Sequence, residues 1–145
     1  MKHPIPGLLA LVLLGATRLG LAGELDITID HVKKPIGTLV VTLMNSEAQW
    51  DNQDKPFLVR NVAAKEAVDD NGQVTVKFAD LPEGDYAVTV IHDENDNQKL
   101  DLGFMHIPTE GWGNSNNPKV WRKPYFSEVK VGVGAAPLPI VIHLH

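Results

Sequence analysis

The stretch QVTVKFADLPEGDYAVTVIHD, residues 73–93, decides the fold. On both sides of its centre, apolar side chains stand at every second position, first as Val74, Val76 and Phe78 and then as Tyr86, Val88 and Val90. This period of two is typical of a strand with one dry and one wet face. In the centre, Pro82 presets its own φ and Gly84 can take a positive φ, so the chain can reverse there. The stretch therefore predicts two adjacent strands joined as a hairpin.

The same alternation recurs in four further segments, which are residues 24–32, 36–45, 127–133 and 138–145. These segments are rich in β-branched residues and lack a helix-capping pattern, which favours strands over helices. A seventh strand is predicted within residues 57–68, whose first half favours an extended chain and whose second half favours a turn of helix. The run is too short for its pattern to decide between them. Short strands separated by Gly, Pro, Asn and Asp predict an all-β fold, a single antiparallel β-sandwich of six to seven strands, immunoglobulin-like in type.

Length and composition indicate one globular domain. The chain has 145 residues, 43% of them hydrophobic and 21% charged, and its formal net charge is −5. Such a length is typical of a single core. An acidic balance argues against nucleic acid as a partner, since phosphate backbones attract basic surfaces. The chain has no cysteine, which excludes disulfides, thiolate metal sites and a cysteine nucleophile.

Residues 1–22 have the features of a signal peptide. A basic start precedes the apolar run 5–14, and small residues precede Gly23, which predicts cleavage before Gly23 and a mature domain over residues 23–145. The apolar run is shorter than the roughly 20 residues that a lasting membrane-spanning helix needs. An uncleaved amphipathic anchor is the alternative, because Arg18 interrupts the leader. Cleavage removes two basic residues and no acidic one, which changes the net charge from −5 to −7. We expect a periplasmic or secreted protein without stable membrane insertion.

The loop HDENDNQKLD, residues 92–101, has the spacing of a calcium loop. Calcium prefers oxygen ligands, and such loops supply them from alternate residues. The predicted ligands are Asp93, Asn95, Asn97, the backbone carbonyl of Lys99, and Asp101. The sixth place, where Gly is usual, holds Gln98, and the twelfth, where a bidentate Glu is usual, holds Phe104. We therefore expect a weak Ca²⁺ site, with a dissociation constant on the order of 10⁻⁴ to 10⁻³ M. The alternative is a polar turn in which Asp and Asn bond their own backbone.

The segment 104–126 concentrates aromatic side chains. It holds five of the nine in the chain, namely Phe104, Trp112, Trp121, Tyr125 and Phe126. Flat rings cover the apolar faces of sugars, and neighbouring amides meet sugar hydroxyls. The segment therefore predicts a carbohydrate-binding surface with Trp112, Trp121 and Tyr125 as ligand-binding residues. The alternative is a flap that packs on itself and closes one end of the sandwich.

Two histidines near the end of the sequence have a spacing that suits a metal ion. His143 and His145 stand two apart and so face the same side of a strand, as two ligands of zinc or copper would. The pattern does not identify a third ligand, for which His31 and His106 are the candidates. A solvated edge strand is the alternative.

The motifs FADLPEGDYAVTVIHDENDNQKLD (78–101) and IPTEGWGNSNNP (107–118) together resemble the bacterial exported family catalogued as domain of unknown function 2141. Its members share LPxGxYAV, HDENxNGKLD and EGxGFSNN-like segments, and the similarity covers residues 24–145. The chain departs from the pattern at Gln98, where relatives often carry Gly, and at Asn114, where they often carry Phe. The LPxGxY turn also resembles transthyretin-like and collagen-adhesin-type sandwiches. The resemblance implies a transthyretin-like sandwich in the periplasm and implies no activity.

No catalytic constellation is apparent in the sequence. The serines lie in no nucleophile motif, and acidic pairs in loops are common without catalysis. The sequence therefore predicts a non-catalytic exported interaction or envelope-associated module, with an unknown protein or glycan partner and a weak calcium loop. The alternative is a carbohydrate-binding module that uses the segment 104–126.

Overall fold

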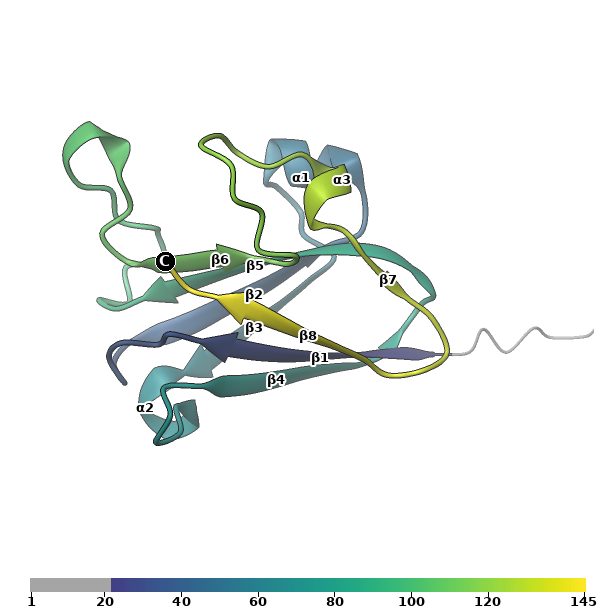
Figure 1. The fold of residues 1–145 in the computed structure, drawn as a ribbon, viewed down its shortest axis with the longest axis horizontal. Coiled ribbons are helices and arrows are strands. Elements are labelled where there is room, and N and C mark those ends of the chain that lie inside the picture. Colours follow the sequence, from purple (N-terminus) through teal and green to yellow (C-terminus); the bar gives the residue numbers. More distant parts are fainter. Residues whose placement is uncertain (1–21) are drawn as a thin grey trace, which may run out of the picture.

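The computed structural model describes residues 22–145, so the predicted signal peptide, apart from Ala22, lies outside the described residues. Strands are its main regular secondary structure (Figure 1). Within it, no helix is long and apolar enough to cross a membrane. In chain order the elements are β1 (Gly23–Asp30), β2 (Thr38–Met44), α1 (Glu47–Asn52), β3 (Leu58–Ala63), α2 (Ala64–Ala67), β4 (Val74–Leu81), β5 (Gly84–Asp93), the 3₁₀ turn η1 (Phe104–His106), β6 (Gly111–Asn114), α3 (Phe126–Val129), β7 (Val131–Val133) and β8 (Leu138–His143).

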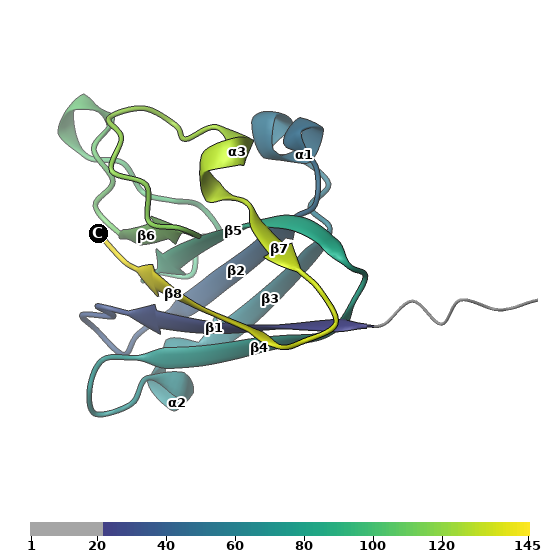
Figure 2. The same cartoon turned by 45° about the vertical axis from the view of Figure 1, so that its right-hand side comes forward.

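The strands form two sheets that pack face to face, as a sandwich does (Figures 1 and 2). One sheet has the order β4-β1-β8, and the other has the order β3-β2-β5-β6, with β7 paired to β5. The described residues hold eight strands, where the sequence predicted six to seven. The pairing is not wholly antiparallel either, because β8 runs parallel to β1, with Ile140 opposite Ile27. Parallel neighbours need a long crossover, which here is the whole chain between β1 and β8.

The core lies between the two sheets and contains the predicted dry faces of the strands. Burying one large apolar side chain contributes roughly 1.5–3 kcal/mol, so these faces fix the strand orientation. The buried residues of the predicted alternation are Leu25, Ile27, Ile29, Leu39, Val41, Leu43, Val74, Val76, Phe78, Tyr86, Val88, Val90, Val129, Val131, Val133, Ile142 and Leu144.

The turn between β4 and β5 is not a hairpin, so this prediction was wrong. β4 pairs with β1 and β5 pairs with β2, and the connection after Leu81 carries the chain from one sheet to the other. The Tyr86 hydroxyl donates to the Pro82 carbonyl oxygen at 2.8 Å and holds this corner. Burial raises the pKa of the Tyr86 phenol. Gly84 does take a positive φ, of 157°, and Asp80 has a left-handed φ of 57° where the register between β4 and β1 shifts.

Three other segments differ from or refine the sequence prediction. Residues 57–68 contain both predicted structures in turn, the strand β3 and the helical turn α2. Residues 127–133, predicted as one strand, divide into the helical turn α3 and the short strand β7. Helix α1 was not predicted. Its N-cap is Ser46, whose hydroxyl accepts from the Gln49 N–H, and it buries Trp50 against a small second core.

Candidate binding groove and its flanking loop

A groove of about 780 Å³ lies on the outer face of the five-stranded sheet. Its floor consists of Thr89 and Ile91 on β5 and their register partners Asn114 and Trp112 on β6. Alternate residues of β5 face the core, so these four point away from it. One wall is the excursion 94–110 between β5 and β6, and the other is the loop 115–125 between β6 and α3, both of which rise on the same side of the sheet (Figures 1 and 2). We call this feature the aromatic groove.

The structure brings two of the three predicted ligand-binding aromatics into this groove. Trp112 is half-buried in the floor, with its ring 5.3 Å from the His145 ring. Trp121 lines the opposite wall and is fully exposed. Tyr125 is not among the lining residues. It is 60% exposed beside the groove, and the Arg122 guanidinium lies over its ring at 4.1 Å.

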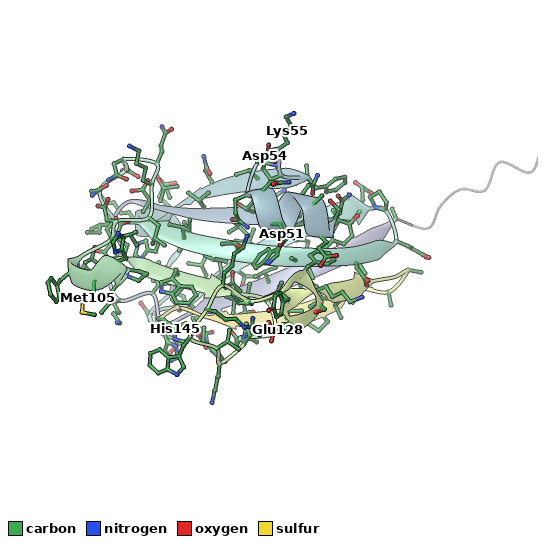
Figure 3. The ribbon with its side chains drawn as sticks, turned by 90° about the horizontal axis from the view of Figure 1, so that it is seen from above. Asp51, Asp54, Lys55, Met105, Glu128 and His145 are labelled. Carbon is green, nitrogen blue, oxygen red and sulfur yellow. The ribbon has the colours of Figure 1, made fainter. Side chains whose placement is uncertain are left out.

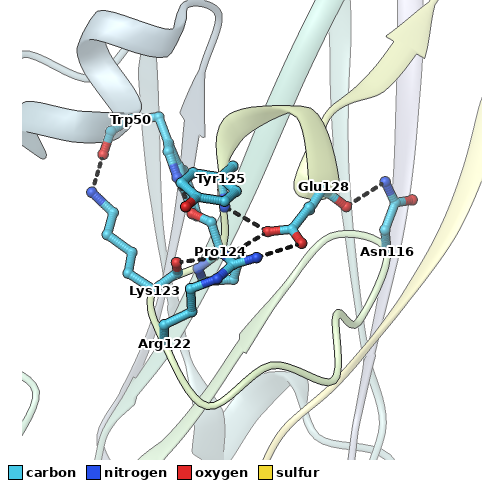
Figure 4. Close-up of polar contacts among 7 residues, drawn as sticks. All are labelled: Trp50, Asn116, Arg122, Lys123, Pro124, Tyr125 and Glu128. Atoms are coloured by element: carbon cyan, nitrogen blue, oxygen red, sulfur yellow. Dashed lines mark hydrogen bonds and ion pairs between the residues drawn. The ribbon is translucent and has the colours of Figure 1, made fainter.

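The wall that carries Trp121 is fixed by an ion pair (Figure 4). The Arg122 guanidinium donates to both carboxylate oxygens of Glu128, at 2.7 and 2.9 Å, and the Tyr125 N–H donates to the same carboxylate at 2.8 Å. These bonds lower the pKa of Glu128 to about 2, with the larger effect from Arg122 and the smaller from the Tyr125 backbone. The loop is thereby closed onto the start of α3.

The same wall is anchored on helix α1. The indole Nε1 of the buried Trp50 donates to the Pro124 carbonyl at 2.7 Å, and the Lys123 ammonium donates to the carbonyls of Trp50 and Asp51 at 2.6 and 3.1 Å (Figure 4). The bond from Trp50 to Pro124 is buried, so it holds the backbone of the loop at Pro124, and the bonds from the exposed Lys123 add to this anchor. These bonds join the loop 115–125 to α1 along one wall of the groove.

The excursion that forms the other wall exposes apolar side chains. Phe104 is 87% exposed, Met105 73% and Ile107 62%. Met105 protrudes from one end of the molecule, well away from Glu128 (Figure 3). Part of the segment 104–126 is therefore open, as the predicted binding surface requires, while part of it packs on α1 and α3.

The loop 93–101 begins this excursion, and its polar groups converge. The buried Asp93 carboxylate accepts from the N–H groups of Asn97 and Gln98, at 3.0 and 2.7 Å. Asn95 and Asn97 accept through their side-chain oxygens from the backbone at 3.1 and 2.9 Å, and their amides donate to Asp101 at 2.6 and 2.9 Å. Gln98 has a left-handed φ of 64°, the conformation for which the sixth place of a calcium loop usually carries Gly. The bonds of Asn95 and Asn97 to the backbone are those of the polar turn that the sequence offered as the alternative to a calcium loop.

Glu110 ties this loop to the start of β6, a role that sequence reasoning did not assign. It is 6% exposed, and its carboxylate accepts from the N–H groups of Glu94 and Asp101, at 2.9 and 3.0 Å. The two sequence motifs, HDENDNQKLD and EGWGNSNN, therefore meet in space. Their joint occurrence was the only signal in the sequence for this contact.

Comparison with known proteins agrees with the pairing of these motifs. A family described as an uncharacterized protein conserved in bacteria, DUF2141, matches residues 27–140. The chain belongs to that family. The match runs from β1 into β8 and includes both motifs, which confirms the resemblance seen in the sequence. No curated protein and no solved structure matches the chain.

The histidine pair predicted in this DUF2141 protein is divided between two environments. His145 packs against Trp112 at the groove. His143 lies instead against Asp30, with His31 beside it. His106 is exposed in the η1 turn. The spacing of two residues did not predict this arrangement, because it depends on which strand lies beside β8.

Proposed function

We propose that this DUF2141 protein is a non-catalytic, exported binding module that takes a carbohydrate in the aromatic groove. One observation carries the proposal, namely that Trp112 and Trp121 line one groove and keep ring surface open to solvent. Export rests on the predicted leader 1–22, which would bring the mature domain to the periplasm or the medium.

The lining of the groove suits a sugar. Its volume of about 780 Å³ lies within the range of ligand sites, roughly 300–1,000 Å³. Indole rings provide flat apolar surface for the faces of pyranose rings, while Gln53, Thr89 and Asn114 can bond hydroxyl groups. Among the described residues that line the groove, none is acidic, and Lys123 contributes a cation. A neutral or anionic glycan therefore meets no repulsive charge there.

The fixed walls also favour binding. Because Arg122 is held by Glu128 and Pro124 by Trp50, the loop that carries Trp121 is ordered before a ligand arrives. A site formed in advance loses less conformational entropy on binding. This reasoning favours a role in binding rather than in closing the sandwich.

The test is a titration of intrinsic tryptophan fluorescence with a panel of neutral and uronic-acid oligosaccharides. We expect a saturable shift with at least one of them. Trp121→Ala removes one ring of the site and should weaken that binding at least tenfold, which corresponds to about 1.4 kcal/mol. Tyr125→Ala tests the third predicted aromatic, and its position outside the lining predicts a smaller effect.

Phe104→Ala is the matched control, since Phe104 is an exposed aromatic that does not line the groove. Its affinity should equal that of the wild type. If no glycan of the panel gives a saturable shift, or if Trp121→Ala binds as tightly as the wild type, the proposal is wrong and the groove serves another ligand or a protein partner.

Calcium binding by the loop 93–101 is a second proposed function of the same module. The left-handed Gln98 favours it, because the departure from Gly does not prevent the turn that a calcium loop needs. Leu100, inside this loop, lines the groove, so an ion held by Asp93 and Asp101 would stiffen that wall. Calcium would then act as a structural cofactor of the binding site.

A thermal melt after dialysis against EDTA tests this second function. With a dissociation constant of about 0.5 mM, 5 mM Ca²⁺ would stabilise the fold by roughly 1.4 kcal/mol. Asp101→Asn should abolish the shift, whereas Asp54→Asn, an exposed acid outside the loop, should retain it. Asp93 is unsuitable for this test, since it is buried and its loss would destabilise the fold by itself. A melt unchanged by millimolar Ca²⁺ would identify the loop as a polar turn.

A further inference from the structure

We propose that Asp30, His31 and His143 form a binding site for a divalent transition-metal ion of the zinc type. Each residue offers one ligand atom, a carboxylate oxygen or an imidazole nitrogen, and these atoms all lie within 4.8 Å of one another. None of the three residues lines the aromatic groove or belongs to the loop 93–101.

The parallel pairing of β1 and β8 builds this site. Asp30 ends β1 and lies opposite His143, which ends β8. His31 follows Asp30 with a left-handed φ of 60°, an uncommon conformation for a residue other than glycine. The His31 ring lies 5.6 Å from the His143 ring, so both imidazoles stand beside the same carboxylate. Two strand ends that are distant in sequence thus deliver three ligands to one point.

The distances suit a small ion after a slight adjustment. Nδ1 of His143 lies 2.7 and 2.8 Å from the two Asp30 oxygens, and Nδ1 of His31 lies 3.2 Å from one of them. Zinc binds nitrogen and carboxylate oxygen at roughly 2.0–2.2 Å, which places the ligand atoms of a tetrahedral site about 3.4 Å apart. Side-chain rotations that move the ligand atoms by a few tenths of an ångström to about one ångström are enough to admit an ion between them.

The chemistry of the ligands selects the class of ion. Two imidazoles and one carboxylate suit Zn²⁺, Cu²⁺ or Ni²⁺, whereas Ca²⁺ and Mg²⁺ prefer oxygen alone. The imidazoles of His31 and His143 are accessible, with side chains 64% and 45% exposed, and Asp30 is 18% exposed. A cleft of about 150 Å³ is lined in part by His31 and so opens beside one of the three ligands. A hydrated ion can therefore reach the site and keep water in its fourth position.

The test uses calorimetric titration of the purified protein, without a histidine tag and dialysed against EDTA, with Zn²⁺ alone. We expect one ion per chain. His143→Gln and His31→Gln should each lower the affinity at least about tenfold, because a three-ligand site loses one of its ligands. Both side chains are substantially exposed, so both variants should fold, which thermal melts will verify. His106→Gln, at an exposed histidine outside the cluster, should bind as the wild type does.

Three results would overturn the proposal. The first is the absence of saturable Zn²⁺ binding. The cluster would then be only a hydrogen bond between His143 and Asp30, with His31 beside it. The second is undiminished binding in both His143→Gln and His31→Gln. The third is an equal loss of binding in His106→Gln, which would indicate unspecific coordination by surface histidines. One ion per chain with selective loss in the two cluster variants would establish the site.

Discussion

Replacing Ser115 by alanine removes a hydroxyl that joins β6, β5 and α3. Ser115 is fully buried, and its Oγ accepts from the Val88 N–H at 2.9 Å and donates to the Val129 carbonyl. Its own backbone N–H donates to the Val88 carbonyl at 3.0 Å, a bond that the substitution leaves in place. The change therefore isolates the two bonds of the hydroxyl.

The expected loss of stability follows from these two bonds. Alanine differs from serine only by the hydroxyl, so the cavity that forms is small, but the Val88 N–H and the Val129 carbonyl lose their partner in a site closed to water. A buried polar group without a partner costs about 1–3 kcal/mol. We expect the free energy of unfolding to fall by about 3 kcal/mol, and the melting temperature of a domain of this size to fall by roughly 10 °C.

Urea denaturation and thermal melts of the two proteins provide the measurement. Ser127→Ala is the matched control, because Ser127 is exposed and its variant should stay within about 0.5 kcal/mol of the wild type. An unchanged m-value would show that the effect lies in stability rather than in the unfolded state. If Ser115→Ala unfolds at the same urea concentration as the wild type, the assignment of these two bonds as buried and irreplaceable is wrong.

Three further predictions follow. Gly37 has a left-handed φ of 67°, and a Cβ there would stand 2.0 Å from the Asp93 carbonyl oxygen. Gly37→Ala should therefore lower the free energy of unfolding, measured by urea denaturation, by more than about 2 kcal/mol. An unchanged urea midpoint would contradict this steric argument. Because the pKa of Glu128 is lowered from 4.5 to about 2, its contribution to stability is complete above pH 4.5 and is lost as the pH falls through 2. In an NMR titration, Arg122→Gln should raise that pKa toward 4.5, and a value that stays near 2 would assign the shift to another cause. Trp50→Phe removes the hydrogen bond to the Pro124 carbonyl and should lower the free energy of unfolding by about 1–3 kcal/mol. Amide hydrogen exchange should become faster in the residues after Trp121. Unchanged exchange would show that other contacts hold the loop.

The alternation of side chains predicted the buried faces of the strands but not their partners. Which face of a strand is dry depends on its own residues, and the predicted faces of 73–81 and 85–93 do lie in the core. Pairing depends on the rest of the chain, so the same stretch was wrongly predicted as a hairpin. The helical turn α3 was missed because a buried Val129 fits a strand and a helix equally well over so few residues.

The candidate site was predictable in its residue types and not in its geometry. The concentration of aromatic residues indicated a surface in 104–126, and Trp112 and Trp121 do share a groove. Tyr125 lies beside the groove because its N–H bonds to Glu128 at the start of α3. Such a local contact produces no periodic pattern in the sequence, so it could not be predicted from one. The histidine spacing indicated His31 as a possible neighbour of His143, which the structure shows, but not the separation of His145 from both, since the partner of His143 is set by the register of β8 on β1.

The parallel pairing of β1 with β8 also bears on the order in which the protein folds. Leu25 lies opposite Leu138, a separation of 113 residues, and β8 follows every other described strand. Closing a loop of that length costs about 2 kcal/mol more entropy than closing a hairpin of ten residues, so this contact forms slowly. Until β8 docks, β1 presents an unpaired edge that can recruit a strand from another chain. We therefore expect the three-stranded sheet to be completed late in folding, and aggregation to be favoured in the interval before β8 docks.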